Sequence, residues 1–330
     1  MLGSLVLLYL GVTLLVDPRC HFGTSIFPCL TLDSRRDKMR LFAEYNRLAP
    51  IEGLILGSSR SMKLSCAELQ KSTGLRWFNF SVDSARTEDY LAIYRWTRAS
   101  DAKLKALVIG LDVEALHDLN ELDDRLKSNP ALMAVLDDAR PSVYSRTSDF
   151  LGLMKTVFSR YFAQDVLRSV RAAFVRLPAS STFDSDGFLH YIQWEDERAA
   201  GTFDLRKNLE KSRAEYRQRF IEMQGLSVRR RAHVERLIKE VQQDNVQVVL
   251  WITPVHTDLA AFLDRTTGYS KRLEETRLFA VRLQVEYGLP VLDFSTPSTF
   301  GATDAGWYDG GHMDEDNALL VVDRLTKELK

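Results

Sequence analysis

Residues 53–60, Gly-Leu-Ile-Leu-Gly-Ser-Ser-Arg, bring an apolar run to an abrupt polar end, and near the other end of the chain two glycines separate Asp309 from His312. A serine hydroxyl, an imidazole and a carboxylate are the three groups of nucleophilic acyl transfer. The histidine takes the hydroxyl proton, and the carboxylate fixes the histidine tautomer and stabilises the imidazolium. The residue types therefore predict an acyl-ester site made of Ser59, His312 and Asp309. Each piece also has a structural interpretation, because Ser-Ser after a strand can cap a helix and Asp-Gly-Gly-His can form a turn.

The elements that would position these residues are indicated by hydrophobic periodicity. Short apolar runs alternate with helical patterns, and the predicted strands are 53–57, 76–82, 106–112, 246–254 and 290–295. This alternation predicts a parallel sheet wound by crossover helices, and the fully apolar strands predict that both faces are covered. We therefore expect a three-layer α/β fold with a five-stranded parallel sheet. A long, mostly helical stretch at about 113–225 is expected to form an insertion at one end of the sheet.

Small polar and ionisable residues lie at the carboxyl ends of these predicted strands, where open α/β sheets bind their ligands. In strand order they are Ser59 and Arg60, Asn79 and Ser84, Asp112, His256, and the pair Asp309 and His312. Their convergence on one edge favours a site over separate structural roles. Arg60 could equally pair with Asp112 or Asp83 and be purely structural. His256 could contact substrate, act as a reserve base or be an ordinary loop histidine. Residues 184–191 could form a cap loop over the site.

The composition argues against several other classes of protein. The 330 residues include 44 basic and 45 acidic side chains, a net charge of −1, which gives no electrostatic footprint for nucleic acid. The sequence has neither the Gly-Lys-Thr ending of a phosphate loop nor a GxGxxG motif. No group of three or four potential ligands has the spacing of a metal site, so we expect neither a metal nor a cofactor.

The amino-terminal segment 2–16 is uncharged and dense in Leu and Val. Its length falls between that of a signal-peptide core and the roughly 20 residues of a membrane span. We expect a membrane anchor over residues 1–17 and a connector over 18–50, with an uncleaved signal segment as the alternative. Of the three cysteines, Cys20 and Cys29 could pair outside the cytosol or stay reduced, and Cys66 stands alone.

Taken together, these motifs resemble the blocks of the SGNH, or GDSL-type, hydrolase superfamily, which has a flavodoxin-like fold. Gly57-Ser58-Ser59 is similar to the first block, Gly-Asp-Ser, whose serine is the nucleophile. Ser84 is the nearest match to the glycine of the second block, and residues 110–113 match the third, Gly-x-Asn-Asp. Residues 309–312 match the Asp-x-x-His of the fifth block.

Asp112 is the main departure from that family. The family has an asparagine there that donates to the oxyanion, whereas an ionised aspartate only accepts. Losing one oxyanion donor typically costs about 10²- to 10³-fold in rate. A protonated Asp112, the backbone N–H groups of Ser59 and Ser84, or the side chains of Asn79 or Arg60 could compensate.

A closer resemblance is to a bacterial, membrane-anchored subset with Gly-Ser-Ser-Arg in the first block and Val-Asp-Pro after a membrane helix, as at residues 16–18 here. Relatives of similar plan take part in O-acetylation of cell-surface polysaccharides or D-alanylation of wall polymers. The resemblance implies an SGNH-like domain over 51–330 and an extracytoplasmic acetylesterase or O-acyltransferase acting on a polysaccharide or glycan. It also implies attachment to the bacterial inner membrane, with the domain facing the periplasm or cell exterior, and envelope-assembly proteins as partners. The alternative is a catalytically decayed glycan-binding or scaffold protein of the same assembly.

Overall fold

The computed structural model describes residues 2–18, 24, 26–27, 33–118, 122–136, 154, 157–158, 160–175 and 181–329. The chain divides into two compact units. The first unit comprises Met1–Asp37 and Asp124–Ala179, and the second comprises Lys38–Asp123 and Ser180–Lys330. Every candidate site residue lies in the second unit.

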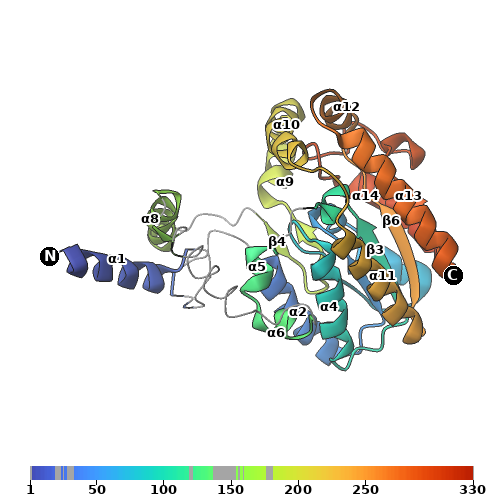
Figure 1. The fold of residues 1–330 in the computed structure, drawn as a ribbon, viewed down its shortest axis with the longest axis horizontal. Coiled ribbons are helices and arrows are strands. Elements are labelled where there is room, and N and C mark those ends of the chain that lie inside the picture. The colour runs from blue at the N-terminus through green and yellow to red at the C-terminus, as the bar shows by residue number, and fades with distance from the viewer. Residues whose placement is uncertain are drawn as a thin grey trace. The chain divides into compact units, whose positions relative to one another are not determined.

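The second unit contains a parallel five-stranded sheet in the order β2-β1-β3-β6-β7 (Figure 1). The strands are β1 (Gly53–Leu56), β2 (Trp77–Asn79), β3 (Ala106–Leu111), β6 (Gln247–Ile252) and β7 (Val291–Asp293). This confirms the predicted sheet, although each strand is shorter than expected. The second strand shows why: β2 ends at Asn79, but the N–H groups of Phe80 and Val82 still donate to the carbonyls of Ile55 and Gly57, at 2.9 and 3.0 Å. The irregular continuation leads the chain toward the end of β1.

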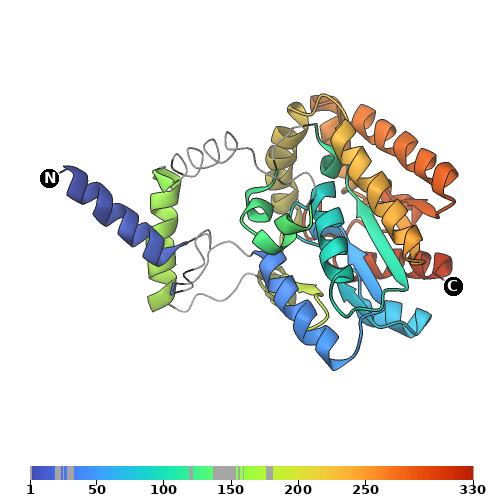
Figure 2. The ribbon, with the colours of Figure 1, turned by 60° about the horizontal axis from the view of Figure 1, so that its bottom comes forward.

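Helices cover both faces of the sheet, which gives the predicted three layers (Figures 1 and 2). The helices that flank it are α2 (Ser34–Leu48), α3 (Cys66–Thr73), α4 (Thr87–Arg98), α11 (Val228–Gln243), α12 (Thr257–Thr266), α13 (Tyr269–Tyr287) and α14 (Glu315–Glu328). On one face, α3 and α14 form a core with inward side chains that include Ile55, Val108 and Trp251. The pleat of β1 sends Leu54 and Leu56 to the opposite face, and all of these side chains are fully buried. The covered faces explain why the strands are apolar throughout.

The beginning and the later part of the predicted insertion belong to the second unit. The beginning forms the short helix η2 (Val113–Leu116), and the later part forms an antiparallel pair, β4 (Thr182–Phe183) and β5 (Leu189–His190), and helices α9 (Ile192–Ala199) and α10 (Leu205–Ile221). The hairpin tip lies on the end of β2, since the N–H of Asn79 donates to the carbonyl of Asp186 at 2.8 Å. Gly187 has φ +84°, and a Cβ there would lie 2.2 Å from the Asn79 carbonyl oxygen. Only glycine fits this close approach.

The first unit contains α1 (Leu2–Val16), α5 (Asp124–Lys127), α6 (Pro130–Ala134) and α8 (Arg160–Phe174). Val16, Val157, Phe162 and Val166 form a small core between α1 and α8. The 15-residue α1 is apolar, yet no helix within the described ranges combines the length and hydropathy needed to cross a membrane. The membrane anchor over 1–17 therefore stays a prediction. Cys20 and Cys29 lie outside the described residues, and Cys66 is buried with a free thiol.

Candidate active site

The structure brings the serine, histidine and aspartate together at the carboxyl end of the sheet. Ser59 begins the short helix η1 (Ser59–Ser61), directly after β1. Its Oγ lies 2.8 Å from Nε2 of His312, and Nδ1 of the same ring lies 2.8 and 2.9 Å from the two carboxylate oxygens of Asp309. The His312 and Asp309 side chains are 18% and 15% exposed, so the constellation is reachable from solvent. This is the geometry of an activated nucleophile with its base and orienting group.

One carboxylate organises both the histidine ring and the loop that carries it. Asp309 Oδ1 also accepts the backbone N–H groups of Gly311 and His312, each at 2.8 Å. Burial alone would raise the pKa of Asp309, but the His312 ring and these N–H groups outweigh it and lower that pKa. Asp309 therefore stays ionised at neutral pH, and its carboxylate accepts a hydrogen bond from the protonated Nδ1 of His312. The lone pair on Nε2 then faces the Ser59 hydroxyl.

The turn that presents Ser59 depends on two glycines. Ser58 caps η1 by accepting the N–H of Arg60 at 3.2 Å. A Cβ on Gly57 would lie 2.3 Å from Ser61 Oγ, and one on Gly110 would lie 2.1 Å from the same atom. The Ser61 side chain thus fills a slot that exists only because both strand ends carry glycine. The slot seats η1 against β1 and β3 and fixes the direction of the nucleophile.

Arg60 and Asp112 point inward and brace this turn. The Arg60 guanidinium is 2.5 Å from Glu114 Oε1 and 3.8 Å from Asp112 Oδ1, and its side chain is only 4% exposed. Asp112 accepts the Thr253 hydroxyl at 2.5 Å, and burial raises the pKa of this carboxyl. These contacts favour the structural interpretation of Arg60 over a substrate contact. Both side chains are placed to stabilise the turn at residues 57–61 from its buried side.

Asn79 and Ser84 have separate roles near the site. The Asn79 amide donates to the Ser61 and Leu64 carbonyls at 2.8 and 3.2 Å, and its oxygen accepts the N–H of Ser81 at 3.1 Å. This amide is fully buried, and its contacts favour a role in supporting η1 over a contact with the oxyanion. Ser84 is exposed and has φ +49°, the left-handed conformation that favours glycine.

His256 stabilises the catalytic loop, the segment 309–312 that carries Asp309 and His312. It precedes α12, where its ring Nδ1 accepts the backbone N–H of Asp258 at 3.1 Å. Its backbone N–H donates to the Gly310 carbonyl at 2.8 Å. Its ring packs edge-on to Trp307, with the centroids 5.5 Å apart. Burial lowers the pKa of His256, so the ring is neutral at pH 7. These contacts favour an ordinary structural role for His256 in its loop over a substrate contact or a reserve base.

Helix α10 explains the glycine pair between Asp309 and His312. The Gly310 N–H donates to Ser212 Oγ at 3.0 Å, and a Cβ on Gly311 would lie 1.9 Å from the Tyr216 hydroxyl. The ring of Tyr216 also faces the Arg60 guanidinium, and its centroid lies 5.2 Å from Arg60 Cζ. The glycines therefore allow the loop to approach α10 closely. Sequence reasoning missed Ser212 and Tyr216, because nothing in the helical pattern marks which face meets the loop.

Helix α9 places an aromatic wall beside the base. The rings of Tyr191 and Trp194 lie 5.7 and 6.2 Å from the His312 ring, and Trp194 stacks on Tyr308 at 5.3 Å. Sequence reasoning suggested a cap loop over 184–191 but assigned no role to these aromatic residues. The close spacing of Tyr191, the last residue of that loop, and Trp194 was the available signal.

Two ion pairs fasten α9 to both sides of the site. Lys63 Nζ, four residues after the nucleophile, lies 2.6 Å from Glu195. Arg198 pairs with Asp314, two residues after the histidine, and donates to the Trp307 carbonyl at 2.7 Å. The wall is therefore held in a fixed position relative to Ser59 and His312.

Within the described ranges, no three or more His, Cys, Asp or Glu side chains are grouped so as to hold a metal ion. No protein-family model and no curated protein matches the chain. Among solved structures, the chain is similar to a Bacteroides fragilis protein described as a candidate acylhydrolase, with 10% identity and a TM-score of 0.42. The match covers 88% of this chain and 94% of that one.

Proposed function

We propose that the protein is a serine acyl-ester enzyme of the SGNH type. The observation that carries this proposal is the 2.8 Å contact between Ser59 Oγ and His312 Nε2, continued through Nδ1 to the Asp309 carboxylate. His312 takes the Ser59 proton as Oγ bonds to the acyl carbon. The resulting tetrahedral oxyanion collapses, the alcohol leaves with the proton from His312, and the acyl group stays on Ser59. Water or a sugar hydroxyl then takes the acyl group by the same steps.

The backbone is the proposed source of oxyanion stabilisation, from the N–H groups of Ser59 and Ser84. The Asn79 amide is used by other partners and Asp112 faces Thr253, which supports this choice. The left-handed conformation of Ser84 also supports it. This oxyanion hole has no side-chain amide donor. We therefore expect a lower kcat than in an enzyme whose oxyanion hole includes one.

A saccharide is the proposed carrier of the acyl group. Trp194 is half-buried and lies beside His312, where the alcohol part of an ester would leave. An aromatic face fixed in this position can pack against the apolar C–H face of a sugar ring, while the sugar hydroxyls stay in water. Trp194→Ala should therefore raise KM for acetylated xylan oligosaccharides by about tenfold and change KM for p-nitrophenyl acetate less than twofold. Equal effects on the two substrates would remove the support for a saccharide.

Attachment to the outer face of the bacterial inner membrane, near envelope-assembly proteins, is proposed as the cellular setting. Large apolar side chains of the first unit are exposed, with Leu7 at 71%, Leu167 at 71% and Phe174 at 82%. Apolar side chains on a helix surface are typical of segments that contact lipid. The full chain should co-sediment with phosphatidylcholine–phosphatidylglycerol vesicles, and Leu7→Glu with Phe174→Glu should release it. Vesicle binding that these changes leave intact would contradict this setting.

The test of the activity is turnover of p-nitrophenyl acetate by the full chain. Ser59→Ala should abolish it, whereas Ser72→Ala, on the exposed surface of α3, should leave it unchanged. Activity that survives Ser59→Ala would exclude the mechanism. Glycan binding without turnover, unaffected by Ser59→Ala, would instead support the decayed binding protein.

A further inference from the structure

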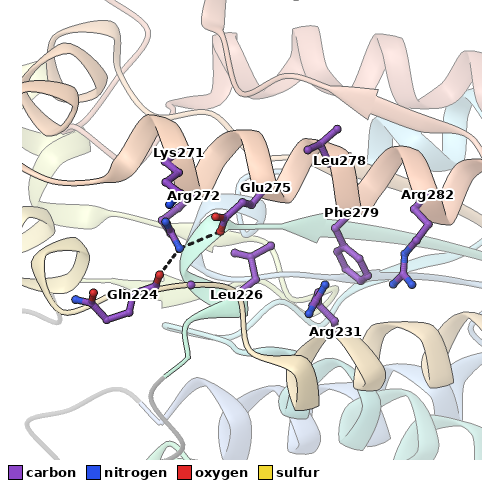
Figure 3. A pocket seen from close by; sticks show the side chains of 10 residues that line it. Gln224, Leu226, Arg231, Lys271, Arg272, Glu275, Leu278, Phe279 and Arg282 are labelled. Atoms are coloured by element: carbon purple, nitrogen blue, oxygen red, sulfur yellow. Dashed lines mark hydrogen bonds and ion pairs between the residues drawn. The ribbon is translucent and has the colours of Figure 1, made fainter.

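A cavity of about 520 Å³ lies between the segment before α11, the first turn of α11, and α13 (Figure 3). It is lined by Gln224, Gly225, Leu226, Arg231, Lys271, Arg272, Glu275, Leu278, Phe279 and Arg282. None of these residues belongs to the triad or to the elements that position it. The volume is within the range of small-molecule binding sites.

The lining carries an excess of positive charge. It has four cationic side chains and one carboxylate. Arg272 pairs with Glu275 at 3.0 Å, and Arg282 pairs with Glu235 outside the lining. Over the part of the chain that the structure describes, Arg231 and Lys271 have no acidic partner. Two positive charges are therefore left to attract an anion.

Hydrogen-bonding capacity is also left over in the cavity wall. Arg272 is only 6% exposed, and one of its terminal nitrogens donates to the Gln224 carbonyl. The buried Nε atoms of Arg272 and Arg231 have no hydrogen-bond partner among the described residues. An unsatisfied buried donor is costly, and the charge of a nearby anion would offset part of this cost. Clustered guanidinium groups suit the oxygens of a phosphate group in particular.

The remaining surface of the cavity is apolar. Phe279 is 4% exposed and forms part of the wall together with Leu226, while Leu278 at the margin is 62% exposed. The Arg282 guanidinium lies 5.3 Å from the centroid of the Phe279 ring. Figure 3 shows the guanidinium groups of Arg231 and Arg282 on either side of that ring. Charge and apolar surface are therefore adjacent.

We propose that this cavity binds a phosphate ester with a short apolar chain, its phosphate held by the cationic side chains of Arg231, Lys271 and Arg272 and its chain against Leu226 and Phe279. Such a group is found on soluble phosphate esters and on phospholipid headgroups. The proposal does not depend on the proposed acyl-ester activity, and Ser59→Ala should bind the ligand as the wild type does.

Isothermal titration of the full chain with hexyl phosphate tests the site. Saturable binding is expected, with inorganic phosphate and hexanol each binding at least about tenfold more weakly because each lacks one half of the ligand. Arg231→Gln and Lys271→Gln should each weaken hexyl phosphate binding by about five- to tenfold. Lys271 is exposed, so its replacement is compatible with folding. Arg40→Gln, an exposed residue of α2 that pairs with Glu44, is the matched control and should not change binding.

Vesicles distinguish the two sources of the ligand. Binding to phosphatidylglycerol–phosphatidylcholine vesicles that Lys271→Gln weakens would assign the site to a lipid headgroup. Hexyl phosphate binding with vesicle binding unaffected by Lys271→Gln would assign it to a soluble ester. Absence of saturable hexyl phosphate binding, or binding that neither Arg231→Gln nor Lys271→Gln weakens, would overturn the proposal.

Discussion

Asp309→Asn is a sharp perturbation of the site because it keeps the shape of the side chain and changes one atom. In the wild type, Oδ1 accepts from His312 Nδ1 and from two backbone N–H groups, while Oδ2 lies 2.9 Å from Nδ1. An asparagine has only one acceptor oxygen. If that oxygen keeps the backbone bonds, the NH₂ group faces Nδ1 and favours the tautomer protonated on Nε2. That tautomer cannot take the Ser59 proton.

The expected magnitude follows from this loss of the base. Replacing the carboxylate by an amide at this position of a serine triad costs about 10⁴-fold in kcat. At about 1.36 kcal/mol for each tenfold change, this is about 5.4 kcal/mol of transition-state stabilisation. The backbone bonds of the loop can be kept by the amide oxygen. The loss of stability is therefore expected to be about 1 kcal/mol.

The assay is kcat/KM for p-nitrophenyl acetate with the full chain, together with thermal unfolding of each variant. Asp304→Asn is the matched control, since Asp304 is 89% exposed and lies 3.9 Å from His256 rather than against the triad. The control should retain activity within about twofold. An Asp309→Asn variant that is folded and retains more than about a tenth of wild-type activity would refute the role of Asp309.

Other perturbations test the support around the site. Burial lowers the pKa of Lys38 in the folded protein to about 7. Between pH 7 and the pKa of an unfolded lysine, near 10.4, the side chain is protonated mainly in the unfolded state. The free energy of unfolding should therefore rise with pH over this range. Urea titrations should show this rise, of up to about 1.4 kcal/mol per pH unit, in the wild type relative to Lys38→Met, and equal pH slopes would contradict it. Arg60→Ala leaves the carboxyl groups of the buried Asp112 and the partly buried Glu114 without their cation and should lower the free energy of unfolding by about 3–5 kcal/mol. A loss below about 1 kcal/mol would show that the cluster does not stabilise the turn. Gly311→Ala should push the catalytic loop away from Tyr216 and lower kcat for p-nitrophenyl acetate about 100-fold, and an unchanged kcat would show that the loop position is not critical.

The sequence was sufficient for the sheet and for the meeting of the three site residues, for an identifiable physical reason. Buried parallel strands are apolar runs, and the carboxyl ends of parallel strands share one edge. Ser59 and the Asp309–His312 pair follow two such strands, so the topology places them on the same edge. Strands β3 and β6 lie between β1 and β7, and the loop after β7 runs back past the end of β6, where the Gly310 carbonyl accepts the backbone N–H of His256. Their separation of 253 positions in sequence is no obstacle.

The surroundings of the site were not predictable in the same way. The two-residue strands β4 and β5 are too short to show periodicity. The positions of Trp194 and Tyr216 depend on how α9 and α10 pack, which no local pattern encodes. Arg60 carried two interpretations until the inward contacts with Glu114 and Asp112 favoured one.

Labelling with a fluorophosphonate tests the central claim most directly, because the reagent bonds only to an activated serine hydroxyl. Peptide mass spectrometry of the labelled full chain should locate the adduct on Ser59, and His312→Ala should abolish labelling because the base is removed. The neighbouring Ser58 and Ser61 are buried and should stay unmodified. An absence of labelling in the folded protein, or an adduct on Ser59 that forms equally fast in His312→Ala, would contradict the account.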